Sequence, residues 1–147
     1  MIARVLAAVD GSSRAPYVVE TATDLVSRYG AAFYLLRTIE VPPEFPAAAA
    51  GIPQDKLPAH LAVVATNELA ALARGANAAV AKILVRVGQP WRTILEVGDE
   101  LDADLIVMGS HGYYGLDRVL GTTAGKVANL AGRNVLIVHD RNRRSAP

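Results

Sequence analysis

The stretch LIVMGSHGYYGLDRVLGTTAG, residues 105–125, determines how the rest of the chain is interpreted. It begins with four consecutive apolar residues, Leu105 to Met108, which is typical of a parallel strand buried on both faces. Glycines follow at 109, 112, 115 and 121. A helical apolar pattern then resumes at Leu120, Thr123, Val127, Leu130 and Ala131. The stretch predicts a strand, a long glycine loop at its carboxyl end, and a helix.

Such a loop is a candidate anion site. Ligands of open α/β sheets bind at the carboxyl ends of the strands, and glycine lets backbone N–H groups approach a phosphate without a Cβ in the way. Gly121-Thr122-Thr123 adds the free N–H groups of a helix start. The alternative is a surface loop whose glycines only provide turns. The loop is neither a Walker loop, since no Gly-Lys-Ser/Thr closes it, nor the dinucleotide fingerprint, whose strand-helix turn is much shorter.

Strands and helices alternate along the remaining sequence. We predict further strands over Val5–Val9, Phe33–Ile39, Ile83–Val87 and Val135–Val138. We predict three further helices: one capped by Ser12 or Ser13, with Pro16 in its first turn and a stop at Gly30, one over Leu57–Arg74, and one following Pro90. This alternation predicts a parallel, doubly wound α/β sheet with right-handed crossovers.

Composition places the chain among single-domain globular proteins. It has 147 residues, 52% of them hydrophobic and 20% charged, and a net charge of +1, which excludes a large basic field for nucleic acid. We predict one domain over residues 1–140, interrupted by a mobile proline-rich connection at about 41–56, and a solvated basic tail at 141–147. The absence of cysteine fits a reducing, cytoplasmic location. No apolar run approaches 18 residues, so we expect no membrane span.

Three motifs resemble the universal stress protein family, in the same order and over nearly the whole chain. They are Val5-Leu-Ala-Ala-Val-Asp-Gly-Ser12, Ala103-Asp-Leu-Ile-Val-Met-Gly-Ser-His-Gly112 and Asn134-Val-Leu-Ile-Val138. Nucleotide-binding members carry Gly-x-x-Gly, nine residues and then Gly-Ser/Thr, which Gly109, Gly112 and Gly121-Thr122 match with eight residues between. The resemblance implies a five-stranded parallel sheet of order 3-2-1-4-5 with four helices, and a homodimer formed by the last strands.

The resemblance also implies a nucleotide site. It points to ATP, with or without Mg²⁺, and leaves AMP and ADP as alternatives. We expect no catalytic residue and no metal ligand from the chain, because no His, Cys, Asp or Glu cluster has metal-site spacing. By resemblance, the contacts are Ala8, Val9 and Asp10 at the nucleoside end, Thr38 at the base, Met108 as an apolar wall, Gly109 and Gly112 at ribose and phosphate, and Gly121, Thr122 and Thr123 at the triphosphate.

Several of these residues also have an ordinary structural interpretation. Asp10 either contacts the ligand or holds its own Asp-Gly turn. Trp91 fits the core better than a stacking platform. For Tyr113 and Tyr114, packing over a bound ligand and simple solvent exposure are equally favoured. Solvent exposure is favoured over ligand contact for His111, Arg118 and Lys126.

These features lead us to expect a cytoplasmic, ATP-binding module that responds to stress and acts on a regulatory protein partner. Turnover of ATP would be slower than roughly once per minute. The last strand, Val135-Leu136-Ile137-Val138, would pair with a second copy, because an exposed apolar edge strand invites a partner chain. Two alternatives stay open: a relative that has lost nucleotide binding and acts through protein contacts, and a slow ATPase.

Overall fold

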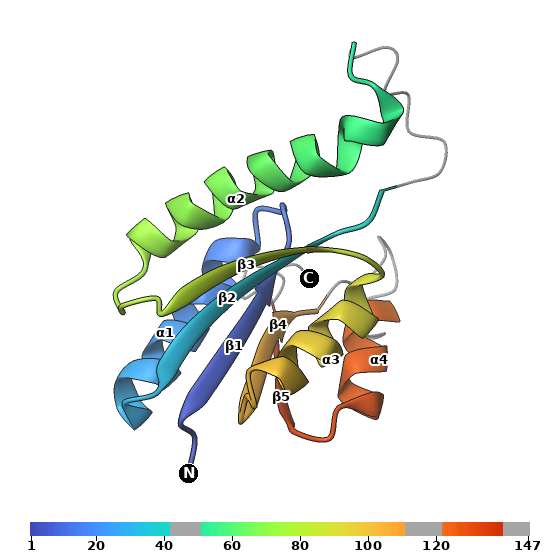
Figure 1. The fold of residues 1–147 in the computed structure, drawn as a ribbon. Helices are drawn as coiled ribbons and strands as arrows, with labels where there is room; N and C mark the ends of the chain where they lie inside the picture. Colours follow the sequence, from blue (N-terminus) through green and yellow to red (C-terminus); the bar gives the residue numbers. More distant parts are fainter. Residues whose placement is uncertain (42–50, 111–121, 140–147) are drawn as a thin grey trace, which may run out of the picture.

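Five parallel strands form one twisted sheet between two pairs of helices (Figure 1). The strand order is β3-β2-β1-β4-β5, which confirms the predicted order. This computed structural model describes residues 1–41, 51–110 and 122–139. The strands are β1 (Arg4–Val9), β2 (Ala32–Ile39), β3 (Lys82–Val87), β4 (Leu105–Gly109) and β5 (Asn134–Val138). The helices are α1 (Ala15–Tyr29), α2 (Leu57–Gly75), α3 (Pro90–Glu100) and α4 (Thr122–Leu130), with a short 3-10 helix, η2 (Gln54–Lys56), before α2.

The central strand β1 divides the core into two layers. Val5, Ala7 and Val9 pack toward α1 and α2, whereas Leu6 and Ala8 pack toward α3 and α4. Strand side chains alternate between the two faces, so a strand covered on both sides must be apolar throughout. That requirement explains why unbroken apolar runs predicted both central strands, β1 and β4.

Helix α1 begins differently from the prediction. Its N-cap is Arg14, which makes no side-chain capping bond, although Pro16 does lie in the first turn. The predicted serine cap is wrong because Ser12 is engaged in the preceding turn, where its hydroxyl donates to Asp10 Oδ1 at 2.6 Å. The predicted stop at Gly30 is confirmed, with φ of +63°.

Helix α4 buries Ala124 and Val127, but Leu130 is 58% exposed. The predicted place of Leu130 on the apolar face is therefore wrong. The buried positions are spaced by three residues from Ala124 to Val127 and by four from Val127 to Ala131. Ala131 packs against the core just after the helix ends.

Parts of the predicted organisation lie outside the described residues. The connection predicted at about 41–56 is described only at Val41 and over 51–56, where η2 leads into the buried Leu57. The predicted tail at 141–147 and the glycine-loop residues 111–121 are not described. Within the described ranges, no helix combines the length and apolar character needed to cross a membrane.

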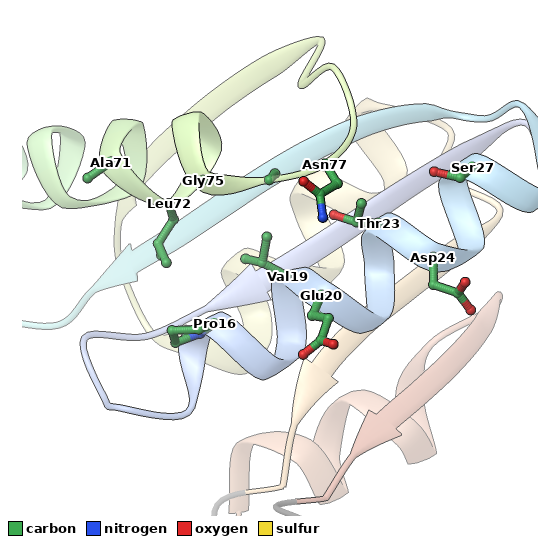
Figure 2. A pocket seen from close by; sticks show the side chains of 11 residues that line it. Pro16, Val19, Glu20, Thr23, Asp24, Ser27, Ala71, Leu72, Gly75 and Asn77 are labelled. Carbon is green, nitrogen blue, oxygen red and sulfur yellow. The ribbon is translucent and has the colours of Figure 1, made fainter.

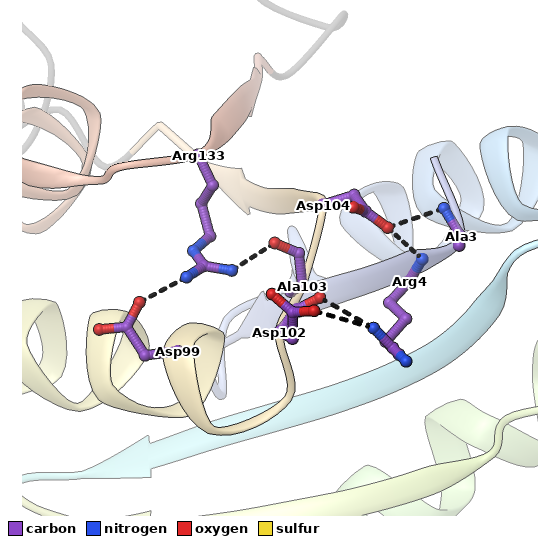
Figure 3. A network of polar contacts seen from close by, with 7 residues as sticks. All are labelled: Ala3, Arg4, Asp99, Asp102, Ala103, Asp104 and Arg133. Atoms are coloured by element: carbon purple, nitrogen blue, oxygen red, sulfur yellow. Dashed lines mark hydrogen bonds and ion pairs between the residues drawn. The ribbon is translucent and has the colours of Figure 1, made fainter. Parts of the chain in front are cut away.

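A polar network ties together the amino-terminal end of the sheet (Figure 3). Asp104 Oδ2 accepts hydrogen bonds from the backbone N–H groups of Ala3 and Arg4, both at 2.8 Å. The Arg133 guanidinium donates to the Ala103 carbonyl and pairs with Asp99 at the end of α3. The two backbone N–H donors lower the pKa of Asp104. The loops at this end of the sheet are thus held together by hydrogen bonds and an ion pair within the chain.

The lowered pKa of Asp104 predicts a specific acid sensitivity. Its folded pKa lies below its unfolded value, so ionised Asp104 stabilises the fold above about pH 4, and this stabilisation is lost as the pH falls through the folded pKa. Asp104→Asn keeps an acceptor oxygen but has no charge to titrate. Thermal melts by circular dichroism should show a larger loss of Tm for wild type than for Asp104→Asn between about pH 6 and about pH 3.

Asp102→Asn is the matched control. Asp102 pairs with Arg4 at 3.2 Å, but its side chain is 89% exposed, and such surface pairs contribute little. Its φ of +48° is also tolerated by asparagine. The control should follow the wild-type profile. Parallel profiles for wild type and Asp104→Asn would contradict the prediction.

Candidate functional site

The opposite, carboxyl end of the sheet contains a cavity of about 250 Å³. It lies where β1, β2 and β4 end side by side. Here the chain leaves β1 through α1 toward one face, whereas α3 and α4 cover the other, which makes this the topological switch point of the sheet. The lining residues are Ala8, Val9, Asp10, Thr38, Pro90, Ile94, Met108, Gly109 and Thr123.

Seven of the ten predicted site residues therefore line one cavity, namely Ala8, Val9, Asp10, Thr38, Met108, Gly109 and Thr123. Gly112 and Gly121 lie outside the described residues. Thr122 is the first residue of α4. The structure thus brings seven of the predicted site residues to one cavity, while Thr122 is not among the residues that line it. The ligand role of each residue stays a prediction.

The cavity has an apolar floor and a polar rim. Ala8, Ile94 and Met108 belong to the core layer beneath α3 and α4 and are each at most 8% exposed. Polar groups come from Asp10 after β1, Thr38 within β2, and Thr123 in the first turn of α4. Because the first N–H groups of a helix lack partners within the helix, α4 also directs backbone donors to this edge.

Asp10 holds the turn that follows β1. Its Oδ1 accepts hydrogen bonds from the Ser12 N–H at 3.0 Å and from the Ser12 hydroxyl at 2.6 Å. Gly11 allows Arg37 to lie close, since a Cβ at Gly11 would stand 2.7 Å from Arg37 Nη2. The turn interpretation of Asp10 is therefore confirmed. Asp10 also lines the cavity, so the same side chain is placed for both of the roles considered from the sequence.

Arg14 connects the start of α1 to the chain that follows β4. Its Nη1 donates to the Ser110 carbonyl at 3.1 Å, which joins the start of α1 to the residue after β4. Ser110 in turn donates its N–H to Val138 at the end of β5, at 3.0 Å. Arg14 was not among the predicted site residues, because a long-range bond of this kind leaves no local sequence pattern.

Gly109 contributes backbone to the cavity wall. A Cβ at this position would lie 3.5 Å from Val18 Cγ2, an ordinary contact on the α1 side of the sheet. Packing against the described residues therefore does not require glycine at 109. Its predicted role beside ribose or phosphate remains open to experiment.

Pro90 and Ile94 are lining residues that sequence reasoning missed. They occupy the first turns of α3, which follows β3 at the same edge of the sheet. Trp91, between them in sequence, packs against the core layer of α3 and α4 as predicted. The Arg92 guanidinium and the Lys126 ammonium lie 5.4 Å and 5.2 Å from its ring centroid. Lys126 is exposed, as expected, and its ammonium lies over the Trp91 ring.

Comparisons with known proteins agree with this fold. A sequence model of the universal stress protein family matches residues 1–139. The chain is similar to universal stress protein A homolog 2 of Coxiella burnetii, with 33% identity over 134 residues that cover 89% of each chain. It is 28% identical to homolog 1 of the same organism over 135 residues, or 91% of this chain and 94% of the relative.

Solved structures of the same architecture match almost end to end. The hypothetical protein MJ0577 superposes with a TM-score of 0.78 at 23% identity, over 97% of this chain and 99% of that one. A universal stress protein in complex with cAMP gives 0.69 at 25% identity, over 94% and 97%. The universal stress protein of Archaeoglobus fulgidus in complex with dAMP gives 0.59 at 23% identity, over 93% and 98%.

Two substitutions at Asp10 separate its turn role from a ligand role. Asp10→Asn keeps an oxygen that can accept from Ser12 but removes the charge, so Tm should change little. Asp10→Ala removes both bonds, which contribute about 0.5–1.5 kcal/mol each, and should lower Tm by about 2–4 °C per kcal/mol lost. If Asp10 also contacts a nucleotide, both variants should bind ATP at least about fivefold more weakly by titration calorimetry. If Asp10→Asn bound ATP as tightly as wild type, the role of Asp10 would be limited to stabilising the turn after β1.

Proposed function

Since the chain belongs to the universal stress protein family, we propose that it binds an adenine nucleotide, ATP first among the candidates, in the cavity at the carboxyl end of the sheet. The observation that carries the proposal is the convergence of β1, β2, β4 and the start of α4 on one cavity with an apolar floor and a polar rim. Structural relatives that hold cAMP and dAMP support a nucleotide as the ligand class.

The volume of the cavity indicates which part of a nucleotide would lie inside it. Pockets that bury a whole drug-sized ligand have about 300–1,000 Å³, so about 250 Å³ suits the base and the adjoining part of the ribose. Ala8, Met108 and Ile94 offer the base an apolar surface, and Met108 adds a polarisable sulfur. In this arrangement the ribose hydroxyls would donate to the carboxylate of Asp10, which lines the cavity.

The phosphates would run along the edge toward α4. That helix begins at Thr122, and its first N–H groups and dipole favour an anion. Thr123 lies where the cavity meets this helix start. Within the described residues, no three His, Cys, Asp or Glu side chains are grouped as a metal site. A Mg²⁺ ion would therefore be held mainly by the phosphates, which is its usual mode of binding.

The same chemistry favours binding over turnover. Backbone donors and apolar walls bind ground state and transition state about equally, and uniform binding does not accelerate a reaction. Among the described lining residues, Asp10 is the one carboxylate, and its Oδ1 already holds Ser12. We therefore propose a cytoplasmic regulatory module whose nucleotide state is read by a protein partner. A cysteine-free chain fits that reducing compartment.

A bulky side chain at Thr38 tests the nucleotide proposal. Thr38→Trp places an indole in the cavity and should weaken ATP binding at least about tenfold, or about 1.4 kcal/mol, without loss of helical signal. Thr66→Trp, on an exposed position of α2 that covers the other face, is the matched control. Titrations with ATP, AMP and cAMP, with mass spectrometry of any nucleotide released on denaturation, would identify the ligand. A wild type that binds none of the three would favour the alternative that acts through protein contacts.

The edge position of β5 supports the second part of the proposal, a homodimer through Val135, Leu136, Ile137 and Val138. In the described sheet β5 pairs with β4 only, and Leu136 is 36% exposed. Leu136→Lys should weaken dimerisation at least about tenfold, because a lysine on an edge strand opposes pairing. Val63→Lys, on a 60% exposed position of α2, is the control. Sedimentation analysis in the micromolar range measures both, and a monomeric wild type would refute the proposed dimer.

A further inference from the structure

The strand-end cavity, at the carboxyl ends of β1, β2 and β4, opens at the level where two of these strands stop pairing. The register of β1 with β4 ends with Ala8 opposite Met108. Beyond this level Val9 and Asp10 line the cavity from one side, and Gly109 lines it from the other. The separation of the two strand ends is therefore set by contacts outside the β1–β4 ladder.

A chain of hydrogen bonds joins the turn after β1 to the residue after β4. Ser12 donates its hydroxyl to Asp10 Oδ1 at 2.6 Å, and its Oγ accepts from the Arg14 N–H at 3.2 Å. Arg14 Nη1 donates in turn to the Ser110 carbonyl at 3.1 Å. Ser110 is held a second time, because its N–H donates to the Val138 carbonyl at 3.0 Å. Arg14 thus links the two strand ends at the level where the cavity opens.

The requirements of helix α1 do not explain an arginine at position 14. Arg14 is the N-cap of α1 and makes no side-chain capping bond, although Ser, Thr, Asp and Asn are preferred there for such bonds. The start of a helix also carries the positive end of the helix dipole, where a cation is unfavourable. Residues that oppose the local preference of their element are expected at functional sites. The partly buried side chain of Arg14 serves the strand ends through Ser110.

We propose that Arg14 is a positioning residue of the nucleotide site. Its guanidinium holds the chain after β4 in place relative to the turn after β1, and so maintains the space between Gly109 and Asp10 that the base and ribose would occupy. Arg14 is not among the residues that line the cavity, so it acts through the Ser110 carbonyl and not by contact with the ligand. This inference rests on the proposed function and identifies a residue that keeps the proposed site in shape.

A second cavity, of about 620 Å³ between α1 and α2 (Figure 2), provides a reference region. None of its lining residues lines the strand-end cavity. Glu20 and Asp24 place carboxylates along it, which repel phosphate. Thr23 also lines it, but its Oγ1 is buried and forms no hydrogen bond, so it offers no polar group to a ligand. We therefore expect neither a nucleotide nor a change at Arg14 to affect the amide signals of this region.

Amide hydrogen exchange of the ¹⁵N-labelled full chain tests the role of Arg14 without a ligand. Arg14→Met removes the donor but keeps an unbranched side chain, so the Ser110 N–H should exchange at least about tenfold faster. Arg14→Lys can still donate to the carbonyl and should restore most of the protection. The Tm of Arg14→Met should change by less than about 2 °C, because removal of a cation from the helix start offsets the lost hydrogen bond.

Arg28→Met is the matched control. It also removes one positive charge from α1, but Arg28 pairs with Asp24 at 2.9 Å near the other end of the helix. The exchange rate of the Ser110 N–H should equal that of wild type in this variant.

Titration calorimetry with adenosine and with ATP tests the role in binding. Because Arg14 acts through the shape of the cavity, Arg14→Met should weaken both ligands by the same factor, at least about threefold, and Arg14→Lys should recover most of the affinity. A cation that contacts the phosphates would weaken ATP alone when removed. A role confined to the stability of α1 would lower Tm and leave both affinities unchanged. Either of these two results would overturn the inference.

The inference and the proposed function can fail separately. If wild type binds both ligands and Arg14→Met binds them equally well, the inference alone is refuted. If wild type binds neither, the proposed function is refuted, and the exchange rate of the Ser110 N–H still decides whether Arg14 holds the strand ends. Unchanged Ser110 exchange in Arg14→Met would overturn the inference in either case.

Discussion

The parallel pairing of β1 with β2 on one side and β4 on the other is the constraint on which this structure depends. Val5 stands opposite both Phe33 and Leu105, and Ala8 opposite both Leu36 and Met108. These registers end β1 and β4 at one level, with β2 extending two residues further, so the ends of the three strands share one edge. They also assign each side chain of β1 to one of two core layers. A register slip of one residue would exchange the layers and dismantle the strand-end cavity.

The two ends of the sheet serve different purposes. At the amino-terminal end, Asp104 and Arg133 close the loops with bonds to backbone and to neighbouring helices. At the carboxyl end, the residues after β1 and β4 are held from the side, by Ser12 and Arg14, which leaves space between the strand ends. Stabilising contacts at one end allow the other end to keep polar groups next to a cavity, an arrangement also seen in other α/β folds.

Most of the fold could be predicted because it depends on local patterns. The apolar runs of β1 and β4 are continuous, and each observed strand begins and ends within one residue of its prediction. The strand order and the set of site residues came from the resemblance of three motifs to one family. The predictions that were wrong, and the features that were not predicted, depend on three-dimensional geometry. Ser12 or Ser13 was expected to cap α1, but the cap is Arg14 and Ser12 is bonded to Asp10. Leu130 is exposed because Ala131, not Leu130, continues the buried positions of α4.

Other features had no local signal at all. Pro90 and Ile94 reach the cavity because a crossover from β3 brings α3 to the same edge, which only the three-dimensional arrangement shows. The space between α1 and α2 depends on how far apart two helices of one layer lie. Thr23 looks like an ordinary helical threonine in the sequence, and its unsatisfied hydroxyl appears only when its neighbours are known.

Ser110 follows Gly109, which lines the strand-end cavity, and links this position to the edge of the sheet. Its carbonyl accepts a hydrogen bond from Arg14, and its N–H donates to the Val138 carbonyl at the end of β5. If a ligand in the strand-end cavity displaced Ser110, it would therefore also act on the last strand through the hydrogen bond to Val138. Such coupling is reciprocal by thermodynamic necessity. To the extent that nucleotide strengthens the association of two copies, association must tighten nucleotide binding by the same factor, so the protein's own concentration would set how sensitively it senses nucleotide.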